Sequence, residues 1–374
     1  MFNSVFLKSC VIACSIAMST TLFLQGCSSG SGGGSTQGTG QNYSGPGSKW
    51  DISLAGDGTF NIIHYPSIGA NSDYTVQGNY IRQSSGFVTL TVTGGSGTGN
   101  PPVGSEAWAI EVPGYAFLLR PVDDDQLVAM VTSGACPTAD IDANWVVVKK
   151  DDNFNGNAGA DLADNDFFGT FNYDSATDTA SLPVFKSLTS GFPSLTADTF
   201  PNGSCSGGIM ELGDAAMYLT ITGGAIVHIG VDTPNDATDD SFIFALTQKA
   251  ITNVNNLDAS YAGILFDDNM DIGQQISPVK LTCTSGSCAG SLVSNVITGA
   301  AVQGATAEVE LTGTVDSIAP GLITGTISYD GTVTGNLACM ADINALSTGK
   351  KIISCVGQSP DDNQAMFNVI FVSI

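Results

Sequence analysis

Charged and basic side chains are scarce in this chain. Of its 374 residues only 12% are charged, where an ordinary soluble protein has about a quarter. The charged residues are 11 Lys or Arg against 35 Asp or Glu, which gives a formal net charge of −24. A surface so poor in positive charge excludes a basic patch for DNA, RNA or anionic lipid, so we expect no nucleic-acid partner.

Groups that carry out catalysis are also few. From residue 31 onward the sequence has no G-x-S-x-G, P-loop, H-E-x-x-H or C-x-x-C-H motif, and its only histidines are His64 and His228. Each histidine stands inside an alternating apolar run, which is typical of a structural or surface-facing strand residue. Residues 203–207 and 286–290 resemble nucleophile elbows only superficially, because strand-like sequence follows both and no histidine follows Cys288. We therefore predict a non-enzymatic protein without catalytic residues.

The first 26 residues are typical of a secretory signal. Lys8 precedes an apolar run over residues 10–24, which is shorter than the roughly 20 apolar residues of a membrane span. The run ends in Leu24-Gln25-Gly26-Cys27, which resembles the lipobox of bacterial lipoprotein precursors. The resemblance implies that the signal peptide, residues 1–26, is removed.

The same resemblance implies that Cys27 becomes a lipidated N-terminus, with a diacylglyceryl group on sulfur and a fatty acyl group such as palmitate on nitrogen. Ser28 and Ser29 follow the Cys, which implies sorting to the outer membrane. The sequence does not decide between the periplasmic face and the cell-surface face of that membrane. Residues 27–48 are almost wholly Gly, Ser, Thr and Gln, so we expect a flexible tether there.

The remaining sequence predicts an all-β fold. Short runs rich in Val, Ile, Thr, Phe and Tyr recur roughly every 8 to 12 residues between Gly, Asn, Asp and Ser, which indicates antiparallel sandwich or barrel-like units. The predicted strands are residues 60–65, 87–93, 116–120, 127–132, 145–149, 218–222, 242–247, 307–314, 322–329 and 367–373. Asp330-Gly331 predicts a hairpin. Residues 340–346 are the best candidate for a short helix.

The size of this body predicts two or three packed units. We place β unit 1 at residues 49–150, β unit 2 at 164–252 and β unit 3 at 257–374. A recurring polar-Gly-small-Cys pattern and similar closing strands suggest that the units are repeats of one another.

Six cysteines follow the tether, and an even number in an exported chain predicts three disulfides. The candidates are Cys136, Cys205, Cys283, Cys288, Cys339 and Cys355. Sequence alone leaves many pairings open. Proximity suggests Cys283 with Cys288 and Cys339 with Cys355, and elimination then leaves Cys136 with Cys205.

One acidic segment matches the opening of a calcium loop. It reads D-x-[DN]-x-[DN]-G from residue 151, and its candidate ligands are Asp151, Asn153, Asn155 and Asp161. The twelfth position is Leu162 rather than Glu, so Asp161 or Asp164 would have to complete the shell. The alternative is a turn between units that needs no metal. A second, weaker acidic loop contains Asp232, Asp236, Asp239 and Asp240.

Together these features predict an outer-membrane-anchored lipoprotein with a non-enzymatic binding, adhesive or envelope-structural role. Its partners would be the membrane, through the lipid, and an envelope or surface protein or glycan. The alternative is a periplasm-facing barrel-type carrier or assembly factor whose cup holds an apolar ligand. A hydrolase of envelope polymers is the least favoured hypothesis.

Overall fold

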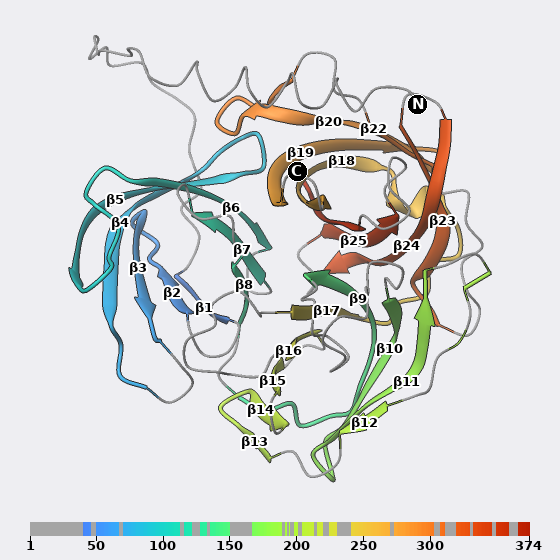
Figure 1. Cartoon of the computed structure of the whole chain (residues 1–374), viewed down its shortest axis with the longest axis horizontal. Helices are drawn as coiled ribbons and strands as arrows, with labels where there is room; N and C mark the ends of the chain where they lie inside the picture. Colours follow the sequence, from blue (N-terminus) through green and yellow to red (C-terminus); the bar gives the residue numbers. More distant parts are fainter. Residues whose placement is uncertain are drawn as a thin grey trace. The chain divides into compact units, whose positions relative to one another are not determined.

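In the computed structural model the chain is all-β, as the sequence predicts, with antiparallel strands in three groups (Figure 1). All described residues belong to the unit Gln37–Ile374. They are residues 40–45, 50–66, 70–112, 116–121, 128–132, 135–149, 167–188, 191–192, 194, 198–200, 204–212, 215–219, 224–229, 241–269, 273–302, 307–310, 319–329, 332–345, 349–358 and 366–374. Their one helical element is the short 3-10 helix η3 (Val254–Leu257). None of their helices is long and apolar enough to cross a membrane.

The first group is a closed barrel in which each strand pairs with the next along the chain. Ser44 of the first strand lies opposite Val131 of the last, which closes the ring. The strands are β1 (Gln41–Gly45), β2 (Trp50–Leu54), β3 (Thr59–His64), β4 (Tyr74–Arg82), β5 (Val88–Gly97), β6 (Glu106–Val112), β7 (Ala116–Pro121) and β8 (Val128–Val131).

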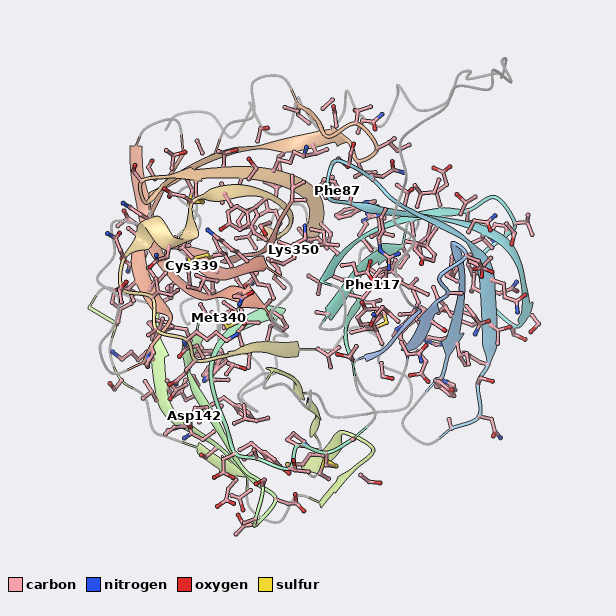
Figure 2. The ribbon with its side chains drawn as sticks, turned by 180° about the vertical axis from the view of Figure 1, so that it is seen from behind. Phe87, Phe117, Asp142, Cys339, Met340 and Lys350 are labelled. Carbon is pink, nitrogen blue, oxygen red and sulfur yellow. A yellow bond between two sulfur atoms is a disulfide. The ribbon has the colours of Figure 1, made fainter. Side chains whose placement is uncertain are left out.

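The interior of this barrel is filled by side chains. Along β4 buried and exposed residues alternate, because successive side chains of a strand point to opposite faces. The inward positions form one buried cluster that includes Tyr43, Ile52, Phe60, Phe117 (Figure 2) and Met130. The described residues therefore form a packed core here, which gives the apolar-carrier hypothesis no support.

The second group is a nine-stranded sheet in the order β12-β11-β10-β9-β17-β16-β15-β14-β13. Its edge strands β12 and β13 are neighbours in the chain, only four residues apart from Phe200 to Ser204, so they lie within about 14 Å of each other. The sheet must therefore curl strongly. Its strands are β9 (Ile141–Lys149), β10 (Phe167–Asp174), β11 (Thr179–Ser187), β12 (Asp198–Phe200), β13 (Ser204–Ser206), β14 (Ile209–Leu212), β15 (Ala215–Leu219), β16 (Gly224–Ile229) and β17 (Ser241–Thr247).

The third group follows η3 and contains a second closed circuit of pairings. β19 pairs with β20 as well as with β18, so eight strands return on themselves in the order β18-β19-β20-β22-β23-β24-β25-β26, and we call them the second ring. The strands are β18 (Ala259–Asn269), β19 (Gly273–Thr284), β20 (Ser287–Asn295), β21 (Ala300–Ala301), β22 (Ala307–Glu310), β23 (Leu322–Tyr329), β24 (Thr332–Ala345), β25 (Lys350–Gln358) and β26 (Met366–Ser373).

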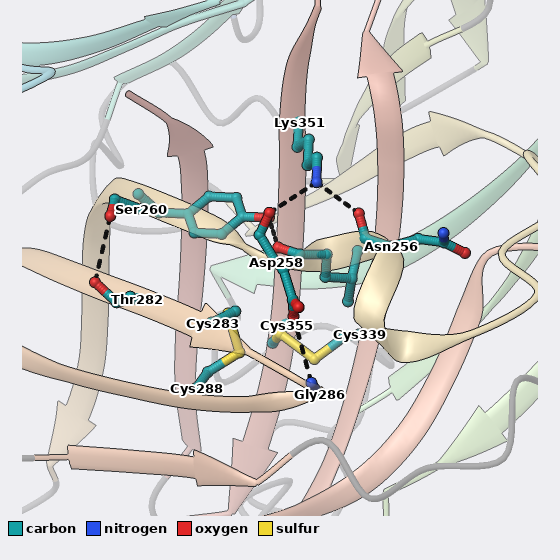
Figure 3. Close-up of a disulfide and its surroundings, with 12 residues drawn as sticks. Asn256, Asp258, Ser260, Thr282, Cys283, Gly286, Cys288, Cys339, Lys351 and Cys355 are labelled. Atoms are coloured by element: carbon teal, nitrogen blue, oxygen red, sulfur yellow. Dashed lines mark hydrogen bonds between the residues drawn. A yellow bond between two sulfur atoms is a disulfide. The ribbon is translucent and has the colours of Figure 1, made fainter.

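Inside the second ring an apolar cluster surrounds two disulfides. One joins Cys283 to Cys288 and the other joins Cys339 to Cys355, and in each pair the residues lie directly opposite each other on neighbouring strands (Figure 3). The third disulfide joins Cys136, in the segment that leads into β9, to Cys205 of β13. These are the pairs that proximity and elimination suggested.

One hydrophobic core runs between the three groups. It contains outward-facing residues of the first barrel such as Ile110, residues of the second group such as Phe168, and outward-facing residues of the second ring such as Ile370. Polar contacts cross the same junction: Lys249 Nζ lies 2.8 Å from Asp342 Oδ2, and Asn144 Nδ2 donates to the Pro320 carbonyl at 2.8 Å.

Three predictions about the boundaries of elements were wrong. The barrel begins at Gln41, inside the expected tether of residues 27–48, because β1 supplies the strand that closes it onto β8. Strand β9 belongs to the second group rather than to unit 1, because it pairs with β10 and β17. Residues 340–345 continue β24 instead of forming a helix, because their backbone pairs with β23 and β25.

Strands β23 and β24 form the predicted hairpin, with Tyr329 opposite Thr332.

Candidate functional site

The first barrel has two unlike ends. Because its strands run alternately up and down, the β1–β2, β3–β4, β5–β6 and β7–β8 connections leave at one end, which we call the loop end. The opposite end, the packed end, carries short turns and faces the second ring. There Ser85 Oγ donates to the Val296 carbonyl, and a Cβ added at Gly86 would come within 2.8 Å of the Ala262 side chain.

Three rings meet at the loop end: Trp50, His64 and Tyr74, which we call the ring cluster. They begin β2, end β3 and begin β4, and they lie opposite one another in register. Each is an even number of residues from inward-facing neighbours such as Ile52 and Ile62, so all three turn toward the barrel axis. The sequence therefore places an aromatic layer over the core.

The rings contact one another directly. The centroids of Trp50 and His64 are 4.5 Å apart in an edge arrangement, and His64 stacks on Tyr74 at 4.5 Å with 12° between the planes. Trp50 and Tyr74 lie 6.2 Å apart, edge to face. Such geometries favour ring pairs beyond their buried area. The cluster is therefore held rigidly by strands rather than by loops.

Asp73 fixes the imidazole of His64. Its Oδ1 lies 2.7 Å from His64 Nδ1 and also accepts from the Tyr74 backbone N–H at 2.8 Å. A carboxylate only accepts, so His64 Nδ1 donates in this bond. Among the described residues, neither His64 Nε2 nor Asp73 Oδ2 makes a hydrogen bond. Asp73 Oδ2 is thus an acceptor atom beside the rings.

The site is accessible to a partner. The side chains of His64 and Asp73 are 19% and 33% exposed, and Trp50 and Tyr74 are half-buried. The β5–β6 connection, residues 98–105, rises at the same end and carries Val103, which is 72% exposed. The arrangement can receive a ligand on the ring faces and on the Asp73 carboxylate.

A second carboxylate lies on the outer side of the same end. Asp51 Oδ1 accepts from Ser44 Oγ at 2.6 Å. Burial raises the pKa of the Tyr65 phenol, and the charge of Asp51 and a hydrogen bond to it add to that effect. Tyr65 therefore stays neutral well above physiological pH.

The packed end holds a polar network inside the barrel. Glu111 accepts from Arg82 Nε at 2.5 Å, from a second guanidinium nitrogen at 2.8 Å and from the Tyr43 hydroxyl at 2.9 Å. The Arg82 guanidinium also lies 4.9 Å from the Tyr80 ring centroid. The hydrogen bond to Glu111 raises the pKa of Arg82. Arg82 and Glu111 satisfy each other, as buried charges must.

The sequence predicts His64 only as a structural or surface-facing strand residue, and it does not predict the ring cluster. The available signal was that Trp50, His64 and Tyr74 each stand at the end of an alternating run; the pairing register that joins them could not be read from the sequence. His228 lies in β16, opposite Ala216 and Phe242.

The lipidation site and the two candidate calcium loops were also predicted from the sequence. Cys27, the calcium candidates Asp151, Asn153, Asn155 and Asp161, and the loop of residues 232–240 lie outside the described residues. Within the described part of the chain, no three His, Cys, Asp or Glu side chains come together to hold a metal ion.

No protein-family model matches the chain, and no curated protein matches its sequence. Three similar solved structures are transferrin binding protein B molecules. A double mutant and a single mutant of this vaccine antigen from Haemophilus parasuis Hp5 are 12% and 11% identical, with TM-scores of 0.29 and 0.28. The isotype 1 protein from serogroup B Neisseria meningitidis is 12% identical, with a TM-score of 0.21.

Each of these comparisons covers 87% of this chain. The chain spans just under two thirds of the matched structures, 66% of the Haemophilus chains and 65% of the Neisseria chain. At these identities and TM-scores the similarity is distant, and it assigns neither a family nor a function to this chain.

Proposed function

We propose that this protein is a non-enzymatic binding lipoprotein of the outer membrane, anchored by acylated Cys27, which meets its partner at the loop end of the first barrel. The lipobox-like Leu24-Gln25-Gly26-Cys27 supports the anchor. The β body supports a binding role, because rigid strands that present side chains beside loops are the usual scaffold of a recognition site.

The observation that carries the proposal is the ring cluster with Asp73. Half-buried aromatic residues beside polar atoms, some with and some without a hydrogen-bond partner, are characteristic of binding sites. In such sites the aromatic rings supply much of the binding energy. The opposite end of the barrel faces the second ring, so the loop end is the one left for a partner.

Site-specific photo-cross-linking tests this proposal. A photoreactive amino acid replaces Val103, which is 72% exposed at the loop end, in the full chain expressed in its own cells. A matched variant carries the same group at Ile81, which is 58% exposed on β4, closer to the packed end. We expect illumination to give a discrete adduct from position 103 and none from position 81.

A second substitution shows whether the adduct depends on the ring cluster. Trp50→Phe, which keeps the core contact but shortens the ring system, is combined with the photoreactive group at position 103. The adduct should weaken while the amount of protein stays the same. Adducts of equal yield from positions 103 and 81, or no adduct from either, would contradict binding at the loop end.

A further inference from the structure

Resting on that proposed function, we infer that the ring cluster and Asp73 form a receptor for a Lys or Arg side chain of a basic protein partner. The inference names the chemistry that the loop end recognises. It rests on Trp50, His64 and Asp73, on the network at the packed end, and on the charge of the chain.

The packed end provides an internal precedent. There a guanidinium lies over the Tyr80 ring while Glu111 accepts two of its hydrogen bonds. An aromatic face and a carboxylate together attract a cation, the first through the ring quadrupole and the second through charge-assisted hydrogen bonds. In that site the chain supplies the cation itself, from Arg82.

The loop end contains the same two components. Trp50 has the ring type that attracts cations best, and it lies against His64, whose Nδ1 is 2.7 Å from the Asp73 carboxylate. Within the described residues, no Lys or Arg pairs with Asp73. Asp73 Oδ2, which makes no hydrogen bond within the described residues, is an acceptor, and Lys and Arg side chains donate hydrogen bonds and accept none.

The charge of the whole chain favours the same partner. With 35 acidic and 11 basic residues, the protein attracts positively charged surfaces and repels negatively charged ones. Near the site Asp51 adds a second carboxylate beside Ser44. A neutral sugar would also fit ring faces and acceptors, but it would gain nothing from this field.

Binding of a fluorescent synthetic peptide of alternating Gly and Arg to the full chain, measured by anisotropy, tests the inference. Asp73→Asn keeps the shape and an acceptor oxygen but removes the charge, so we expect affinity to fall about tenfold. The matched control is Asp57→Asn, because Asp57 is an exposed carboxylate in the β2–β3 turn at the packed end whose pKa is lowered by its hydrogen bonds from Thr59. That control should change affinity less than about twofold.

Two further arms complete the experiment. Trp50→Phe should weaken peptide binding about threefold, and raising the salt from about 50 to about 500 mM should weaken it strongly. Equal losses in the Asp73 and Asp57 variants would overturn the inference, because they would mean general attraction to an acidic surface. Binding of a neutral chitin tetrasaccharide in place of the peptide would overturn it as well.

The cross-linking and peptide-binding experiments together distinguish an error in the cation-binding inference from an error in the proposed function. If position 103 cross-links on cells but the Arg peptide does not bind through Asp73, the loop end is a binding site for another class of partner. If neither experiment gives a signal, the proposed function itself is wrong.

Discussion

The first barrel and the second ring are stabilised by different interactions. Both are closed circuits of eight antiparallel strands with a filled interior. The described part of the first barrel contains no cysteine and encloses the Arg82–Glu111 pair. The second ring encloses two disulfides and packs against η3. Lys351 Nζ donates to the carbonyl of Asn256 in η3 and to that of Asp258, the residue after it (Figure 3).

This difference indicates how the two parts contribute to the protein. Disulfides across neighbouring strands hold a scaffold together in an oxidising compartment, and they act mainly by restricting the unfolded chain. A polar network depends instead on every partner being present. In the first barrel the Arg82–Glu111 ion pair therefore stabilises the packed end. The ring cluster lies at the other end of the barrel, the loop end.

The largest expected effect comes from breaking the network of the first barrel. Glu111→Ala leaves the Arg82 guanidinium without its carboxylate inside the barrel, and we expect a loss of about 3 kcal/mol in the free energy of unfolding. Denaturant titration followed by tryptophan fluorescence measures it. The paired replacement Arg82→Met with Glu111→Leu removes both charges and should restore most of the loss. A double variant as unstable as Glu111→Ala would show that the network acts through something other than charge.

Removing the disulfides of the second ring should have an equal or smaller effect, graded by the length of the loop that each one closes. Replacing Cys339 and Cys355 by Ala opens a loop of 16 residues and should cost about 3 kcal/mol, whereas the Cys283–Cys288 pair, with a separation of 5, should cost about 2 kcal/mol. Hydrogen exchange should locate the added opening in β18–β26 and leave β1–β8 unchanged. Equal exchange in both parts would contradict their separate stabilisation.

The smallest effect concerns pH. Burial, together with a hydrogen bond to Asp178, raises the pKa of Tyr173 to about 12, above its ordinary value of 10.0. The unfolded chain loses this proton at lower pH than the folded one, so its contribution to stability is complete below about pH 10 and disappears as the pH rises toward 12. Tyr173→Phe should reduce the loss of stability between about pH 9 and pH 11 by no more than about 1 kcal/mol. An identical pH slope in the two proteins would show that Tyr173 has no such role.

Much of the fold could be predicted from local pattern. Alternation of apolar and hydroxyl residues indicated the strands, since period-two burial needs only the sequence of one segment. The misplaced boundaries share a cause, because β1 and β9 are assigned by their partners rather than by their own composition. Gln41–Gly45 is polar and short, and it is a strand because β2 and β8 pair with it.

The candidate site was harder to predict for the same reason. Trp50, His64 and Tyr74 become neighbours only through the registers of β2, β3 and β4. A shift of one residue in either pairing would turn a ring to the opposite face of the barrel. The cysteines were easier, because four of them lie close to their partners in the sequence.

The lipid anchor at Cys27 is the central proposal, and mass spectrometry of the mature N-terminal peptide tests it directly. We predict that the peptide purified from membranes begins at Cys27 and carries a diacylglyceryl thioether and an N-terminal fatty acyl group. A mature N-terminus at another residue, or an unmodified Cys27, would contradict the proposal of a lipid-anchored binding protein.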